Sequence, residues 1–218
     1  MNTIPSRRVF LKMIQLAVGL TLGCLGIASA QRPPMPPCVA LEHSSGEPLL
    51  EYLSGDRAVL SSDCVEVALR RLGVNGSVPA SSVPVAIDIL VRFLDFRSEG
   101  AASVGVLLPP PEWTRFYLYP ARTALVGIGP RAVDRLISAI ADATASDIVV
   151  ENATYAIDSI YNVADGPSGS LRAVVALSGA ASATSNASSA SRLRAEARKL
   201  AGKCAGSELQ SRCEAALN

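Results

Sequence analysis

The chain has 218 residues, of which 20 are basic, 19 are acidic, one is histidine and five are cysteine. Hydrophobic residues make up 49% of it and aromatic residues 5%, which excludes a collagen, a wholly disordered chain and a multi-span membrane protein. The near-neutral charge argues against a nucleic-acid binder, and one histidine excludes any metal site that needs two. The length predicts one domain, at most two.

Residues 1–30 have the three parts of a secretory signal peptide. A basic start is followed by an apolar run over 13–27 and by a small-x-small cleavage site at Ala28 and Ala30. The basic start resembles the bacterial twin-arginine export signal, which implies a periplasmic or secreted protein. The run is shorter than the roughly 18 residues of a spanning helix, so no stable span is expected after cleavage; an N-terminal membrane anchor is the alternative. The residues that carry the resemblance are Ser6, Arg7, Arg8, Phe10, Leu11 and Lys12.

Cleavage before Gln31 leaves 188 residues with 17 basic and 19 acidic side chains, a net charge of −2. Four cysteines remain, and in an exported chain they predict two disulfides with three possible pairings. We favour Cys204–Cys213, across a short turn, and Cys38–Cys64, which ties the Pro-rich leader to the first helix. Four free thiols are the alternative, expected if the chain stays in a reducing compartment.

Residues 31–47 form a Pro-rich leader, for which an extended conformation is expected. Over 48–218 the apolar residues recur at i, i+3, i+4 and i+7, which predicts amphipathic helices. Strand-like alternation is almost absent, so the fold class is expected to be all-α. The stripes begin at Val65, Ile87, Ala121, Val133, Ala153 and Leu171, and a further apolar pattern runs from Leu193.

Helix ends are marked by proline, glycine and small polar residues. Pro120 suits a first turn, and Gly129-Pro130 separates two stripes by a tight turn. Asp147, Ser170 and either Ser188 or Ser189 are candidate N-caps for the helices that follow them.

The stripes are expected to pair as helix–turn–helix units: Val65 with Ile87, Ala121 with Val133, and Ala153 with Leu171. The segment 121–140, of the form A-x-x-A-L-x-x-I-G, a turn, then A-V-x-x-L-I-x-A-I, resembles the short bacterial HEAT-like repeat. The resemblance implies a solenoid of stacked antiparallel helix pairs, with a concave surface formed by the second helix of each pair. An irregular helical bundle is the alternative, because periodicity alone does not separate the two.

The segment 97–119 is predicted to be an insertion between helices. It holds the only tryptophan and a run of three prolines. Aromatic and arginine side chains beside a rigid segment are typical of a binding hot spot; alternatively, they pack the insertion onto the helices. The candidate binding residues are Trp113, Arg115, Tyr117 and Tyr119.

No catalytic or metal site is predicted. His43, the only histidine, is expected to be a solvated leader residue, and no nucleophile motif accompanies it. Four acids are expected on the solvent side of their helices: Asp134, Asp142, Asp158 and Glu196. The basic run Arg192, Arg194, Arg198, Lys199 and Lys203 is expected to be a solvated face that Glu196 interrupts.

These patterns favour an exported protein-interaction or scaffold module, not an enzyme, that binds another protein and no nucleic acid. The HEAT-like resemblance implies no cofactor. Two alternatives stay open: a small-ligand binder or enzyme that uses 97–119, and a structural subunit of an envelope complex. The sequence does not decide the oligomeric state.

Overall fold

The computed structural model describes residues 38–75, 78–98 and 118–218, all within one unit, Pro36–Asn218. These residues form helices and turns with no strand among them, so the all-α prediction is confirmed. The signal segment 1–30 and most of the predicted insertion lie outside the described residues. The α-helices are α2 (Cys38–Glu42), α3 (Gly46–Leu53), α4 (Ser62–Asn75), α5 (Val83–Val91), α8 (Pro120–Ile128), α9 (Val133–Ala141), α10 (Asp147–Asp165), α11 (Gly169–Ala183), α12 (Ala187–Ala201) and α13 (Gln210–Ala215). The short 3₁₀ helices are η1 (Arg57–Val59), η2 (Gly129–Ala132), η3 (Gly166–Ser168) and η4 (Gly202–Cys204).

The leader is shorter than predicted, because its last part is helical. Helix α2 lies inside the range 31–47 that was expected to be extended, and α3 begins at Gly46. The prolines end at Pro37, and the next residues supply an apolar anchor: Leu41 is buried in the main core. Burial of this side chain explains why a helix forms directly after the proline run.

The predicted apolar stripes form the core. Every residue of the Val65 and Ala153 stripes is buried, as are Ala121, Leu136 and Val174. Val175 is an exception: it is 51% exposed on the outer side of α11. One main cluster runs through the helices from α2 to α12, and a small second cluster of Leu171, Cys204 and Cys213 lies near the C-terminus.

The helix ends differ from the predicted caps by one to three residues. Gly129 does end α8, with a φ of 79° that favours glycine. Ser146, rather than Asp147, caps α10 by accepting a hydrogen bond from the amide of Val149. Asn186 caps α12 in place of Ser188 or Ser189, and Ser170 lies inside α11.

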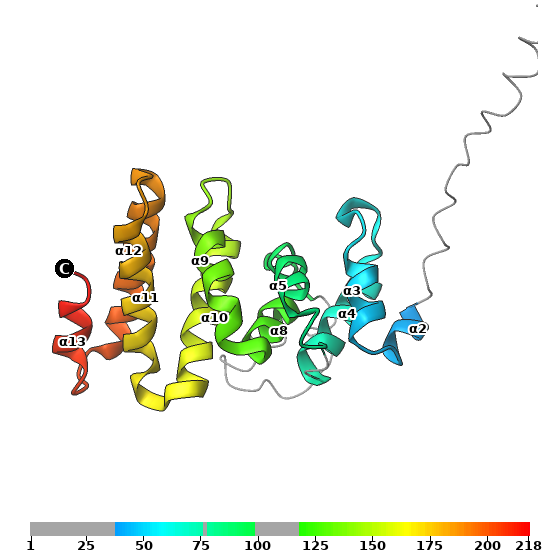
Figure 1. The fold of residues 1–218 in the computed structure, drawn as a ribbon, viewed down its shortest axis with the longest axis horizontal. Helices are drawn as coiled ribbons and strands as arrows, with labels where there is room; N and C mark the ends of the chain where they lie inside the picture. Colours follow the sequence, from blue (N-terminus) through cyan, green and yellow to red (C-terminus); the bar gives the residue numbers. More distant parts are fainter. Residues whose placement is uncertain (1–37, 76–77, 99–117) are drawn as a thin grey trace, which may run out of the picture. The chain divides into compact units, whose positions relative to one another are not determined.

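Helix contacts arrange the main helices in two rows, which we name row A and row B. Row A runs α3, α5, α9, α12, and row B runs α4, α8, α10, α11, with each helix contacting the next in its row. The rows also contact each other through α3–α4, α5–α8, α9–α10 and α11–α12 (Figure 1). In the first three pairs the row A helix precedes the row B helix in the chain. In the last pair the order is reversed, because α11 belongs to row B and α12 to row A.

This arrangement changes the predicted pairing. The stripes of α8 and α9 were expected to face each other, but α8 packs mainly on α4, α5 and α10, while α9 packs on α10 and α12. The α10–α11 hairpin does form as predicted. Gly169 is required at its turn, because a Cβ there would lie 2.4 Å from the backbone nitrogen of Asn162.

Candidate functional site

Ser98 and Leu118, the described residues on either side of 99–117, meet near the start of α8. The amide of Ser98 donates a hydrogen bond to the carbonyl of Leu118 over 2.9 Å. Ser98 is buried, and its hydroxyl accepts a hydrogen bond from the Arg70 guanidinium at 2.8 Å. This contact fixes the backbone at Leu118, directly before Tyr119.

Tyr119 is the only predicted binding residue that the structure describes; Trp113, Arg115 and Tyr117 lie outside the described residues. Tyr119 directly precedes Pro120 and is partly exposed. Its ring centroid lies 5.3 Å from the guanidinium carbon of Arg122. The same guanidinium carbon lies 4.2 Å from the ring centroid of Tyr155 on α10. Arg122 therefore joins two tyrosines from neighbouring row B helices by cation–π contacts.

A hydrogen bond with Asn152 on α10 fixes the position of the Arg122 side chain. The arginine is 2% exposed, and its Nη1 donates to Asn152 Oδ1 at 3.0 Å. Asn152 Nδ2 in turn donates to the carbonyl of Leu94 at 2.7 Å, just after α5. Because buried polar groups stay in place only when they are hydrogen-bonded, this network fixes the positions of α5, α8 and α10 relative to each other.

Tyr155 is also close to a second cation. Lys203 Nζ lies 5.8 Å from the Tyr155 ring centroid and 2.7 Å from Asp158 Oδ2. The hydroxyl of Ser170 donates to the other oxygen of Asp158 at 2.8 Å. Asp158 is 4% exposed, so its expected position on the solvent side is wrong. Its carboxylate can be buried because Lys203 pairs with its charge and Ser170 donates a hydrogen bond to it.

We call these residues the polar cluster: Tyr119, Arg122, Asn152, Tyr155, Asp158 and Lys203. The cluster is built by α8, α10 and η4. Tyr155 belongs to the outer stripe of α10, which it shares with Ile148, Glu151 and Val163. The cluster thus supports two partly exposed tyrosines on the outer side of row B.

Glu196 is a second acid that sequence reasoning placed wrongly on the solvent side. It is 4% exposed, and Oε2 accepts a hydrogen bond from the Thr154 hydroxyl at 3.1 Å. Lys199 pairs with its other oxygen. Asp134 and Asp142 are exposed as expected, and so is His43.

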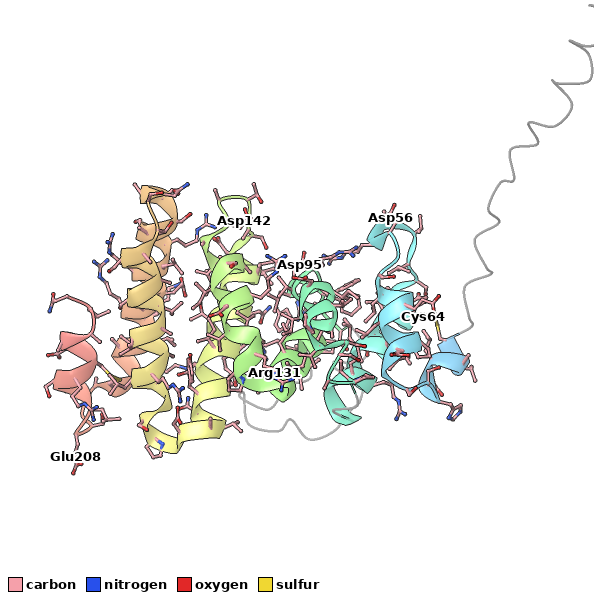
Figure 2. All side chains as sticks on the ribbon, viewed as in Figure 1. Asp56, Cys64, Asp95, Arg131, Asp142 and Glu208 are labelled. Atoms are coloured by element: carbon pink, nitrogen blue, oxygen red, sulfur yellow. A yellow bond between two sulfur atoms is a disulfide. The ribbon has the colours of Figure 1, made fainter. Side chains whose placement is uncertain are left out.

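A cavity of about 270 Å³ lies beside the polar cluster. Lys203 belongs to both the cavity lining and the polar cluster, and Glu208, which Figure 2 shows near α13, also lines the cavity. The volume falls just below the roughly 300 Å³ at which small-molecule pockets usually begin. The lining residues are Pro167, Ser170, Lys203, Cys204, Ser207, Glu208 and Leu209.

The clear pKa shifts concern groups outside the polar cluster. Burial raises the pKa of Tyr52. Hydrogen bonds from the backbone and hydroxyl of Thr144 lower the pKa of Asp142. The hydrogen bond and charge of Asp165 raise the pKa of Arg172. Each of these shifts has a local structural cause.

Both predicted disulfides are present. Cys38 is bonded to Cys64 and Cys204 to Cys213, with Cα–Cα distances of 4.8 and 6.5 Å. All four described cysteines are therefore oxidised, and their sulfurs are not nucleophiles. Among the described residues, no group of three His, Cys, Asp or Glu side chains could hold a metal ion. None of the helices described is long and apolar enough to cross a membrane.

Comparison of the chain with protein-family models, with curated proteins and with solved structures found no match. The site must therefore be interpreted from its own geometry. Sequence reasoning found Tyr119 but missed Arg122, Asn152 and Tyr155. One signal was available for Arg122, since a charged residue stands inside the stripe of Ala121, Ala124 and Leu125. No sequence pattern indicated that Arg122 contacts Asn152 and Tyr155 on α10.

Proposed function

We propose that this chain is an exported protein-interaction or scaffold module of the HEAT-like type. Its docking face is the outer side of row B, centred on Tyr119 and Tyr155. The observation that carries this proposal is the Arg122 guanidinium held near both tyrosine rings by a buried asparagine. Tyrosine and arginine are the residues that most often dominate binding energy, above all where they are held rigid before binding.

The two-row arrangement suits a helical solenoid, although α8 and α9, whose residues carry the HEAT-like resemblance, do not pack mainly on each other. Row B brings the outer faces of α4, α8, α10 and α11 together along one side. The outer residues of α4 add a Glu66–Arg70 ion pair to this side, and those of α11 add Arg172 and the exposed Val175. Such a mixed surface of aromatic, charged and apolar side chains suits a protein partner.

Export to the periplasm, or secretion, is part of the proposal. Two disulfides are expected in an oxidising compartment and are rare in the cytosol. The signal-like segment 1–30 agrees with this location. We propose that cleavage before Gln31 releases the chain from this segment.

The proposal is tested by quantitative co-purification from the envelope of the producing cells. Tyr155→Ala should reduce recovery of the specific partner at least about tenfold, since a tyrosine hot spot contributes about 2 kcal/mol or more. Val85→Ala is the matched control, because Val85 is 57% exposed on α5 in row A. A partner that binds both variants equally, or the absence of any protein partner, would contradict the proposal.

A small-ligand function is the second candidate, and the cavity beside Lys203 favours it. Its polar groups, Ser170, Ser207 and Glu208, suit a small polar molecule. A ligand adduct in the native mass of the wild-type protein that Lys203→Met abolishes would move this candidate to first place. A structural subunit of an envelope complex would instead co-purify in fixed stoichiometry with its neighbours.

A further inference from the structure

The outer face of α12 carries two arginines without a partner. Arg194 and Arg198 are exposed and stand one helical turn apart, and their side chains make no hydrogen bond or ion pair with any described residue. The opposite side of α12 is buried through Leu193, Ala197 and Leu200. The two guanidinium groups are thus held on the solvent side of the last helix of row A.

The acid that interrupts this basic run in the sequence does not lie on the exposed face of α12. Glu196 faces inward to Thr154, so it does not neutralise the outer face. Arg192 is also turned away, since its guanidinium donates to the carbonyls of Asp142 and Ala143. What remains outside is the pair Arg194 and Arg198, with Lys199 partly neutralised by Glu196.

The first helix of row A carries the opposite charges in the same spacing. Glu47 and Glu51 on α3 are exposed and one turn apart, and neither side chain has a partner among the described residues. Leu49, Leu50 and Leu53 fix the orientation of α3 by packing into the main core.

The net charges of the regions around α3 and α12 also have opposite signs. Residues 38–98 hold 8 acidic and 5 basic side chains, a net charge of −3. Residues 187–218 hold 6 basic and 3 acidic side chains, a net charge of +3. Residues 99–186 hold 8 acidic and 5 basic side chains, also a net charge of −3, so the C-terminal region is the one basic part of 38–218. Its net charge favours contact with an acidic part of another copy, and the spacing of Glu47 and Glu51 selects α3.

We propose that copies of this chain associate head to tail, with α12 of one copy docking against α3 of the next. In this arrangement Arg194 and Arg198 face Glu47 and Glu51, and row A continues from one copy into the next. The contact is heterologous, so it produces rings or open chains of copies rather than a symmetric dimer. The occupant is a second copy because the same chain supplies the complementary charges with matched spacing.

This association is expected to be weak and sensitive to salt. Exposed ion pairs contribute little each and are screened at high ionic strength. It uses row A and the termini of the fold, so it is independent of the docking face proposed on row B. Failure of one proposal leaves the other intact.

The test is sedimentation velocity on the full chain over a concentration series at low ionic strength. Wild-type protein should self-associate, and high salt should reverse this. Arg194→Glu/Arg198→Glu should weaken self-association at least about tenfold, because it replaces two attractions by repulsions. Arg97→Glu/Arg131→Glu is the matched control: it changes the net charge equally at exposed arginines outside α12 and should leave self-association unchanged.

A charge swap makes the test specific to the proposed contact. Glu47→Arg/Glu51→Arg should also be monomeric alone, because both of its docking faces are then basic. Mixing it with Arg194→Glu/Arg198→Glu should restore association between the two variants. Circular dichroism checks that each variant remains helical.

Two results would overturn the proposal. One is wild-type protein that stays monomeric at low salt, and the other is a mixture of swapped variants that stays monomeric. If the monomeric wild-type protein sediments with phosphatidylglycerol vesicles, the two arginines are assigned to lipid headgroups instead.

Discussion

The two ends of the described unit are each closed by a disulfide, but the bonds have different surroundings. Near the N-terminus, Cys38–Cys64 spans 26 residues and ties α2 to α4, next to Leu41 and the rest of the main core. Figure 2 shows Cys64 on α4, facing α2. Near the C-terminus, Cys204–Cys213 spans nine residues and joins η4 to α13 over a separate small cluster.

The difference shows what each bond contributes. At the N-terminal end a disulfide adds to an apolar core that already holds α2, α3 and α4 together. At the C-terminal end the only other buried member of the cluster is Leu171, so little apolar area is removed from water and the bond substitutes for a core. We therefore expect loss of the first bond to affect global stability and loss of the second to affect α13 alone.

The largest effect is expected from Cys38→Ala/Cys64→Ala. Removing a cross-link of this loop length lowers the free energy of unfolding by about 3.5 kcal/mol, because the unfolded chain regains its freedom. The measurement is equilibrium urea denaturation followed by circular dichroism. A loss below about 1 kcal/mol would mean that core packing alone holds this end.

A smaller and local effect is expected from Cys204→Ala/Cys213→Ala. The shorter loop corresponds to about 2.5 kcal/mol, and we expect it to appear as faster hydrogen exchange at the amides of Cys213 and Ala216. Both amides are bonded within the C-terminal segment, to Leu209 and Arg212. Amides of α10 should keep their protection. Equal loss of protection in α10 would contradict the distinction between the two ends.

The buried carboxylate of Asp158 links the C-terminal end to the rest of the unit. Lys203→Met should lower the free energy of unfolding by about 1–2 kcal/mol, less than for a fully buried pair because the Lys203 side chain is 49% exposed. Adding Asp158→Asn should recover part of this loss, since no buried charge then lacks a partner.

The matched control for this variant is Arg135→Met, which breaks the exposed pair with Asp88. Its cost should stay below about 0.5 kcal/mol. Chemical denaturation of the four proteins measures all these differences. Equal costs for Lys203→Met and Arg135→Met would show that Asp158 does not depend on Lys203.

The smallest effect is a pH dependence at the N-terminal end. Burial raises the pKa of Tyr52 above its ordinary value of 10.0. Above pH 10 the unfolded chain loses this proton while the folded chain retains it, so the free energy of unfolding falls as pH rises toward the folded pKa. Tyr52→Phe should show a shallower alkaline decline in a urea series. An identical decline would assign it to other groups.

Periodicity within the sequence predicted which residues of each helix are buried. The stripes of α4 and α10 and the all-α class follow from local patterns. Both disulfide pairs were favoured among three possible pairings, and both are confirmed. Periodicity did not predict which helices meet, because an apolar stripe fits any complementary stripe. The α8–α9 pairing was therefore wrong, and the contact between Arg122 and Tyr155 was not foreseen.

The buried acids show the same limit. Asp158 and Glu196 stand at positions that a charged residue normally turns to solvent. Distant partners contact both carboxylates: Ser170 and Lys203 for Asp158, and Thr154 for Glu196, which also pairs with the nearby Lys199. The distant partners are 12, 45 and 42 residues away, a separation that no local pattern records.

The central claim is that an exported, disulfide-bonded helical unit works by binding another protein. Mass spectrometry of the chain purified from its own cell envelope, first native and then denatured, tests it most directly. The account predicts a denatured chain that begins at Gln31 and is four hydrogens lighter than its reduced form, and a native complex with a protein of different mass. A full-length reduced chain, or a native species bound only to a small molecule, would contradict it.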